Sequence, residues 1–209
     1  MNRIICLVFL FITYVNSSVI AQEIKVVSLM EFPSDSTAVS NPVYDINGNL
    51  CAVLKVHGAI SELTFSGMIV GDVMTDGSNS YLLHIPSKTK RIKYQHPEFL
   101  PGVIDFTEFQ LAVESGKVYS AILKANTTES SSNNATQYLT FKSKFPLKSI
   151  LVNGEEWSCK KDWGVYVAMA RKMVLVGYYN YVARAEDGRV WTGTVEVKNA
   201  KVNKTVTIE

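Results

Sequence analysis

Apolar and polar residues alternate over short stretches of this chain, and clusters of turn-forming residues separate the stretches. In residues 51–57 the alternation places Ala52, Leu54 and Val56 on one face, and residues 91–96 alternate in the same way. Successive side chains of a β-strand point to opposite faces, so this pattern predicts strands. The predicted strands are residues 24–32, 51–57, 81–85, 91–96, 118–123, 138–145, 162–168, 173–183, 190–197 and 202–208. Long stretches with a helical period are missing from the sequence, and we expect an all-β protein.

Tight turns are predicted where Asn or Asp precedes Gly, because these pairs tolerate the positive φ that hairpin turns require. The four pairs are Asn47-Gly48, Asp76-Gly77, Asn153-Gly154 and Asp187-Gly188. The last pair is expected to join residues 173–183 and 190–197 as a hairpin. Short strands at this spacing, with turns between them, favour antiparallel β-sandwiches.

One polar segment divides the predicted strands into two series. Residues 126–136 (NTTESSSNNAT) contain no large apolar side chain, so they cannot contribute to a core. We therefore predict two tandem antiparallel β-sandwich modules, residues 22–125 and 137–209, joined by a linker or exposed loop at residues 126–136. A module of roughly 70 residues buries only about 60% of its unfolded surface, so the two are expected to lean on one another.

The first 21 residues have the features of a secretory signal peptide. Arg3 precedes an apolar stretch, residues 4–15, and Val19-Ile20-Ala21 supplies the cleavage positions. The competing interpretation is an uncleaved N-terminal anchor, although the apolar stretch is short for spanning a bilayer. No later stretch approaches the ~20 apolar residues of a transmembrane helix. The expected location is outside the cytoplasm, in the periplasm or at the cell surface.

The charge balance excludes one class of partner. The sequence has 21 Lys+Arg and 19 Asp+Glu, and removal of residues 1–21 takes away only Arg3, which leaves a net charge of +1. This balance gives no electrostatic footprint for nucleic acid. Two cysteines, Cys51 and Cys159, follow the signal peptide, one in each half. They are either free thiols or a bridge, and a bridge would need a fixed interface between the modules.

The second half resembles PEGA-type domains, which are small β-sandwiches of bacterial envelope proteins. The resemblance rests on residues 150–154 (ILVNG), on Gly177, Tyr179 and Tyr181 in a G-x-Y-x-Y step, and on the closing residues 193–197 and 206–208. The Pro-Glu-Gly-Ala signature itself is absent, and residues 145–147 stand near its place. The stretch 44–56 is similar to the N-terminal modules of Bacteroidetes envelope proteins. The resemblance implies a structural or interaction role and transfers no catalytic residue.

Catalytic and metal-binding patterns are not visible in the sequence. The three histidines, His57, His84 and His96, form no H-x-H or H-x-x-x-H pair, whereas a zinc site needs three or four converging ligands. Nucleophile-elbow and phosphate-binding glycine motifs are also missing. We therefore expect a non-enzymatic protein without metal or cofactor.

Two groups of residues are candidates for contact with a partner. Lys88, Lys90, Arg91 and Lys93 form the densest basic cluster, which is either a solvated strand face or a contact for an anionic envelope polymer. Trp157 and Trp163 flank a polar segment that contains Lys160 and Lys161, and rings so placed are candidates for stacking on a sugar or a partner. The expected function is a structural or protein-interaction module of the bacterial cell envelope that contacts a protein or a glycan. The alternative is a carbohydrate-binding protein using the exposed rings, and a hydrolase is a third.

Overall fold

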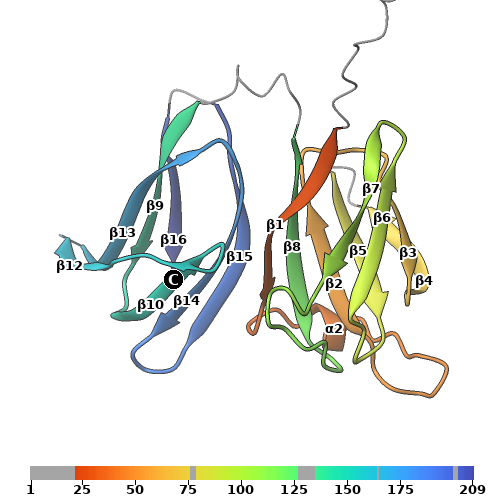
Figure 1. Cartoon of the computed structure of the whole chain (residues 1–209). Helices are drawn as coiled ribbons and strands as arrows, with labels where there is room; N and C mark the ends of the chain where they lie inside the picture. The colour runs from red at the N-terminus through yellow and green to blue at the C-terminus, as the bar shows by residue number, and fades with distance from the viewer. Residues whose placement is uncertain (1–21, 76–78, 127–134, 164, 200–201) are drawn as a thin grey trace, which may run out of the picture.

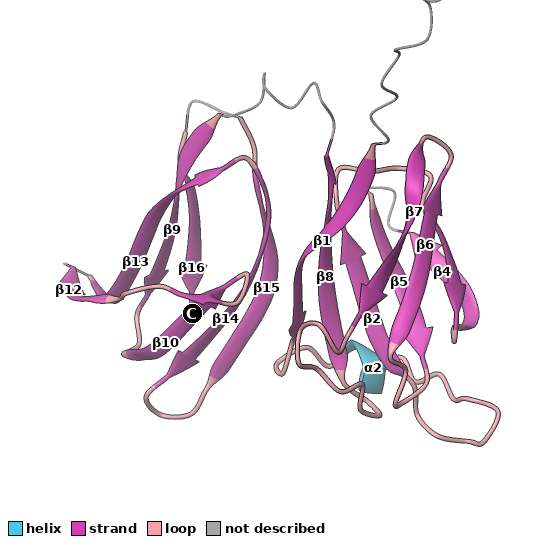
Figure 2. Cartoon of the chain, viewed as in Figure 1, coloured by secondary structure: helices cyan, strands magenta, loops and turns pink. Residues whose placement is uncertain are grey.

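The prediction of an all-β protein is confirmed. The structure is a computed structural model that describes residues 22–75, 79–126, 135–163, 165–199 and 202–209, and the predicted signal peptide lies outside these ranges. Apart from the four-residue helix α2 (Thr37–Ser40), the regular elements of the described residues are strands (Figure 2). The first strands are β1 (Glu23–Glu31), β2 (Ala52–His57), β3 (Thr64–Gly67), β4 (Val70–Thr75), β5 (Ser80–Ile85), β6 (Arg91–His96), β7 (Phe99–Asp105) and β8 (Val118–Asn126). The remainder are β9 (Thr136–Ser143), β10 (Leu147–Val152), β11 (Glu155–Glu156), β12 (Lys160–Trp163), β13 (Tyr166–Leu175), β14 (Gly177–Ala185), β15 (Val190–Val197) and β16 (Lys204–Ile208).

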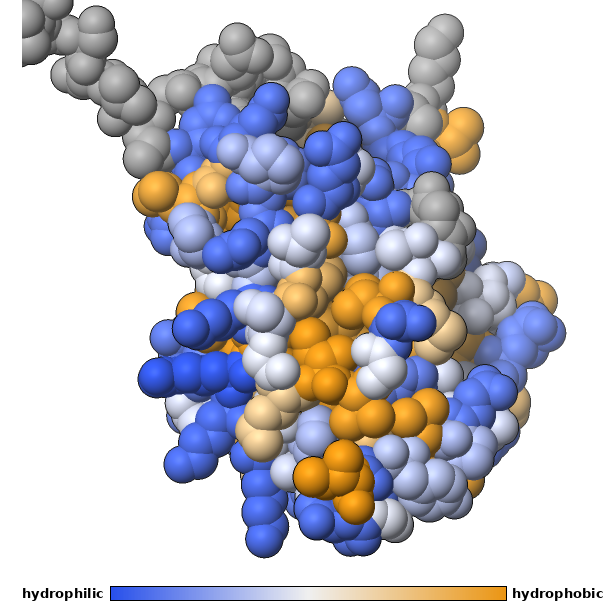
Figure 3. Space-filling view, turned by 90° about the vertical axis from the view of Figure 1, so that its right-hand side faces the viewer, coloured by the Kyte–Doolittle hydropathy of each residue, from blue (hydrophilic) through white to orange (hydrophobic). Residues whose placement is uncertain are grey.

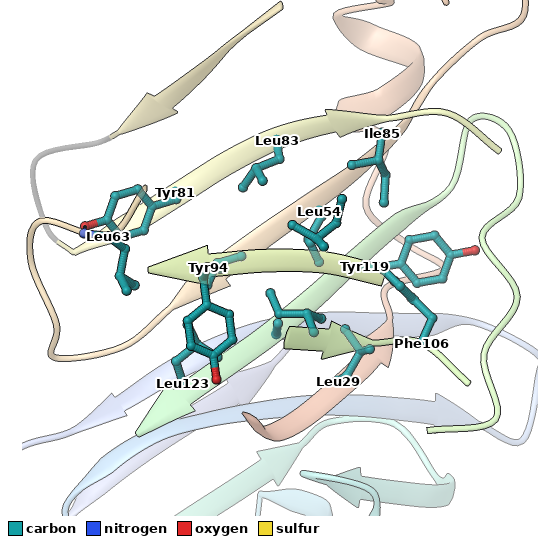
Figure 4. Close-up of a cluster of buried hydrophobic side chains, with 14 of the residues drawn as sticks. Leu29, Leu54, Leu63, Tyr81, Leu83, Ile85, Tyr94, Phe106, Tyr119 and Leu123 are labelled. Carbon is teal, nitrogen blue, oxygen red and sulfur yellow. Dashed lines mark hydrogen bonds between the residues drawn. The ribbon is translucent and has the colours of Figure 1, made fainter. Parts of the chain in front are cut away.

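The N-terminal unit differs from the predicted two-sheet sandwich. Its described strands form one eight-stranded sheet in the order β3-β6-β7-β1-β8-β2-β5-β4, which curls around its own core (Figure 1). The end strands β3 and β4 are consecutive in the sequence, so the chain crosses directly from one edge of the sheet to the other. Leu54, Leu83 and Ile92 are fully buried in this core, which also contains Tyr94 and Tyr119 (Figure 4).

In each unit a tyrosine ring lies over a glycine of the neighbouring strand. Tyr94 pairs with Gly102, and Tyr181 pairs with Gly193. A Cβ on Gly102 would overlap the ring of Tyr94, and a Cβ on Gly193 would lie 2.9 Å from the ring of Tyr181. The Tyr94 hydroxyl also donates to the Ile24 carbonyl at 2.7 Å, which ties β6 to β1. Each glycine therefore leaves room for the neighbouring tyrosine ring, because it has no Cβ.

The C-terminal unit places two four-stranded sheets around one core. The sheet orders are β11-β10-β14-β15 and β12-β13-β9-β16. Residues 173–183, predicted as one strand, are divided at Val176 because β13 and β14 belong to different sheets. The core receives side chains from both sheets: Leu139, Phe141, Ile150, Val152, Ala168, Ala170, Val195, Val197 and Ile208.

A buried polar junction connects the two units. Asn180 of β14 has no exposed surface, and its Oδ1 accepts from the Ser120 hydroxyl at 2.9 Å and from the Thr194 hydroxyl at 2.8 Å. Its Nδ2 donates to the Ser120 carbonyl at 3.0 Å and to the Ser28 hydroxyl at 3.4 Å. Ser28 and Ser120 belong to β1 and β8, so these bonds cross from one unit to the other. The expectation that the two halves support one another agrees with this contact.

The turns follow the sequence signals where the structure describes them. Asn153 and Gly154 have φ of 49° and 84° between β10 and β11, and Gly188 has φ of 90° in the hairpin from β14 to β15. Of the predicted linker, residues 127–134 lie outside the described ranges, as does the pair Asp76-Gly77. Cys51 and Cys159 are free thiols, and burial raises the pKa of both.

Candidate functional site

The sheet β12-β13-β9-β16 turns one face away from the N-terminal unit, and we call it the outer face (Figure 1). Ala168 and Ala170 of β13 point into the core. Because side chains alternate along a strand, Met169, Arg171 and Met173 point outward. The pairing register of the strands shows which outward residues of β12, β9 and β16 lie opposite these residues of β13, and residues opposite one another form a row across the sheet. Lys160, Met169, Lys142 and Thr207 form one row, and Arg171, Thr140 and Thr205 form the next.

Cations on the outer face lie against tyrosine rings. The Arg171 guanidinium carbon is 3.9 Å from the centre of the Tyr138 ring, and the Lys142 ammonium is 5.1 Å from the centre of the Tyr166 ring. Cation–π contacts of this kind attract the charge toward the ring and hold the side chain in place. Lys160 is exposed in the same row as Lys142. The face thus presents three cations, two of them positioned by aromatic rings.

Negative charge on this face is confined to one end in the part of the chain whose side chains are described. Glu209, which follows β16, pairs with Lys144 at 2.9 Å. Beside the cations lie apolar side chains and hydroxyls, among them Met173, which is 54% exposed, and the exposed Thr205. The outer face is therefore positive, with uncharged surface beside the charges.

Trp157 does not lie on this face, and the prediction that its ring is exposed is wrong. The ring is 7% exposed and packs edge-on against Phe141, with ring centres 5.8 Å apart. The Trp157 amide donates to the Ile150 carbonyl at 2.9 Å, which directs the side chain into the core. Lys161 and Trp163 belong to β12, but their side chains lie outside the described part of the chain. The carbohydrate-binding alternative relied on Trp157 and Trp163. Of these two rings the structure describes only that of Trp157, which is buried.

The predicted basic cluster of the N-terminal unit is exposed as expected. Lys88, Lys90, Arg91 and Lys93 are all exposed at or beside β6. Arg91 is not a free charge, because its Nε lies 2.6 Å from Asp105 Oδ2. A hydrogen bond from the Thr107 hydroxyl and the bond from Arg91 lower the pKa of Asp105 to about 2. This cluster therefore presents Lys88, Lys90 and Lys93 on a polar loop and strand, beside an arginine that is paired.

An open groove of about 320 Å³ lies on the N-terminal unit, lined by residues of β2, β4 and β5. Within it, His57 Nδ1 is 2.9 Å from Ser80 Oγ, and the His57 ring stacks on Tyr178 of the C-terminal unit. Lys55 binds Asp35 at 2.6 Å. Burial raises the pKa of Asp35, but the bonds from Lys55 and Thr37 outweigh it, so the net pKa lies below its usual value.

The groove holds the groups of a serine–histidine pair, which is the minimum for nucleophilic chemistry. Asp35 is connected to the groove through the lining residue Lys55, and its oxygens accept from Lys55 and Thr37. In a catalytic triad the carboxylate orients the histidine, whereas the Asp35 carboxylate binds Lys55 and Thr37. Among the described residues no group of three or more His, Cys, Asp and Glu side chains could hold a metal ion.

An apolar patch lies where the two edges of the N-terminal sheet meet. Figure 3 shows apolar residues gathered on the side of the molecule that carries β3 and β4. Met68 and Met74 are exposed there, while Phe65, Ile69 and Val73 are half-buried against the core. This patch was not predicted from the sequence, because it forms only when β3 and β4 become the two edges of one sheet.

Comparisons with protein families, curated proteins and solved structures find no match to this chain. The resemblance to PEGA domains and to Bacteroidetes envelope proteins therefore stays a prediction. In the described part of the chain no helix is long and apolar enough to cross a membrane.

Proposed function

We propose that this chain is an exported, non-catalytic interaction protein of the bacterial cell envelope, built from two β modules and located in the periplasm or at the cell surface. Its partner is an envelope protein or a glycan. The proposal also takes residues 1–21 as a cleaved signal peptide.

The junction at Asn180 is the observation that carries this proposal. Four polar groups from both units bond to one buried amide, an arrangement that fixes the relative orientation of the units. Buried polar networks of this kind specify a unique arrangement when their members are satisfied. The N-terminal sheet and the sheet that contains β14 are held against each other at this junction, and the outer face, on the other sheet of the C-terminal unit, is left free for contact. This is the property expected of a display or scaffold module.

Two measurements test the proposal. Residues 1–30 are fused to a reporter enzyme that is active only outside the cytoplasm, with Arg3→Glu combined with a Leu7→Asp substitution as the export-deficient control. Activity of the first fusion alone supports export, and mass spectrometry of the processed chain is expected to give an N-terminus at or near Gln22. An inactive wild-type fusion, or an intact N-terminus in envelope material, contradicts the proposal.

A further inference from the structure

We propose that the outer face binds an anionic polysaccharide, with Lys142, Lys160 and Arg171 as the residues that contact its carboxylate or phosphate groups. This proposal rests on the proposed function, since it names the partner of that envelope protein.

The first argument is the spacing of the three cations. Lys160 and Lys142 are in one row, separated by the strand β13. Neighbouring strands lie about 4.8 Å apart, so the two Cα atoms are about 10 Å apart. Arg171 is two residues from Met169 along β13, about 7 Å from that row. Three cations therefore fit within the span of a few sugar units, and each can meet a separate acidic group of one polymer.

The second argument is preorganisation of the charges. Arg171 lies on Tyr138 and Lys142 lies toward Tyr166. A long side chain that is already held on a ring loses less conformational freedom when it meets an anion. The guanidinium also offers a planar fork that matches carboxylate and phosphate oxygens in pairs. Arg171 is therefore expected to be the strongest single contact.

The third argument is the surface beside the cations. Thr205 and Thr207 of β16 place hydroxyls beside Lys142 and Thr140, and Met173 adds exposed apolar surface. A polysaccharide presents both hydroxyls and apolar C–H faces, so this mixture complements it. The described carboxylate at the end of the face, Glu209, is neutralised by Lys144, so the face does not repel an anionic chain.

The experiment measures binding of the purified full chain to polygalacturonate, a carboxylated polysaccharide, with neutral dextran and anionic phosphatidylglycerol vesicles as separate arms. Binding to polygalacturonate alone is expected, and it should weaken as NaCl rises because exposed charges are screened. The double variant Lys142→Gln/Arg171→Gln should bind about tenfold more weakly, since each exposed ion pair contributes up to ~1 kcal/mol. Lys160→Gln, which alters an exposed side chain of β12, should bind about threefold more weakly.

The matched control is Lys88→Gln/Lys90→Gln, which removes the same charge from the N-terminal unit. Its binding should equal that of the wild type, and urea midpoints of all variants should show that folding is retained. Equal losses in the control and the outer-face variant, or binding to vesicles but not to polygalacturonate, overturn the proposal. If export is observed but polygalacturonate is not bound, this inference fails and the proposed function stands. If export fails, the proposed function itself is wrong.

Discussion

Replacement of Asn180 by alanine is expected to uncouple the two units. The side chain is fully buried and bonds to Ser28, Ser120 and Thr194 at the junction. Alanine removes the side-chain amide and leaves the Ser120 carbonyl and three hydroxyls without this partner. The substitution therefore acts on the contact between units more than on the core of either one.

The size of the effect follows from the groups left behind. A buried polar group without a partner costs about 1–3 kcal/mol. The Ser120 and Thr194 hydroxyls lie 3.4 Å apart and can bond to each other, which compensates for part of the loss. The Ser120 carbonyl and the Ser28 hydroxyl lose the Asn180 amide nitrogen as a donor. We expect a net loss of about 2–4 kcal/mol.

Urea unfolding followed by tryptophan fluorescence measures this loss. All three tryptophans belong to the C-terminal unit, so fluorescence reports on that unit while far-ultraviolet circular dichroism reports on both. Coincident transitions are expected for the wild type and separated transitions for Asn180→Ala. Thr192→Val is the control, because the Thr192 hydroxyl bonds across the same junction to the exposed Ser34 hydroxyl, and its effect should stay below about 0.5 kcal/mol. A loss below that value for Asn180→Ala, with transitions that still coincide, refutes a structural role for the junction.

Three further outcomes are expected in urea melts. Trp157→Ala should cost about 3–5 kcal/mol, as aromatic truncation in a core does, and a loss below about 1 kcal/mol contradicts its burial. Gly188→Val should cost about 1–3 kcal/mol from its φ of 90° alone, since a Cβ there meets no atom within 4 Å, and an unchanged midpoint argues against the turn. Burial lowers the pKa of His84, so the unfolded chain binds its proton more readily. Stability should therefore fall as the pH drops below about 6.5, and less so in His84→Gln. Identical pH dependence in both proteins rejects this.

Alternation predicted the strands that have one face in a core. The bounds of β6 and β15 match the predicted residues 91–96 and 190–197, because Ile92 and Tyr94, like Val195 and Val197, face inward at every second position. The hairpin turn at Asp187-Gly188 was also predicted, since the positive φ at Gly188 favours glycine.

Strands whose positions depend on distant partners were not predicted. β7 contains Pro101 and Gly102 and has little alternation, because Gly102 makes room for the Tyr94 ring. The break between β13 and β14 was missed because the same apolar stretch serves two sheets, with Gly177 as the local sign.

The candidate site was predicted only in part, for the same physical reason. Trp157 follows Glu155-Glu156 and precedes polar residues, so local composition indicated exposure, but pairing with Ile150 turned the ring inward. Arg171 and Lys142 are 29 positions apart and become neighbours only through the register of β13 with β9. A lone Asn180 within an aromatic strand gave no sign of the junction, since its partners are on the other unit.

The polar nature of the junction has a consequence for the order in which the chain is made. The N-terminal sheet has all its strands once β8 has left the ribosome, whereas the C-terminal unit needs its last strand, because β16 pairs in parallel with β9. During that delay the first unit exposes the hydroxyls of Ser28 and Ser120, which water can solvate as well as Asn180 does. A half-synthesised chain thus exposes a polar, hydrated surface at Ser28 and Ser120 instead of an apolar one. We expect this to limit self-association before the C-terminal unit has been made.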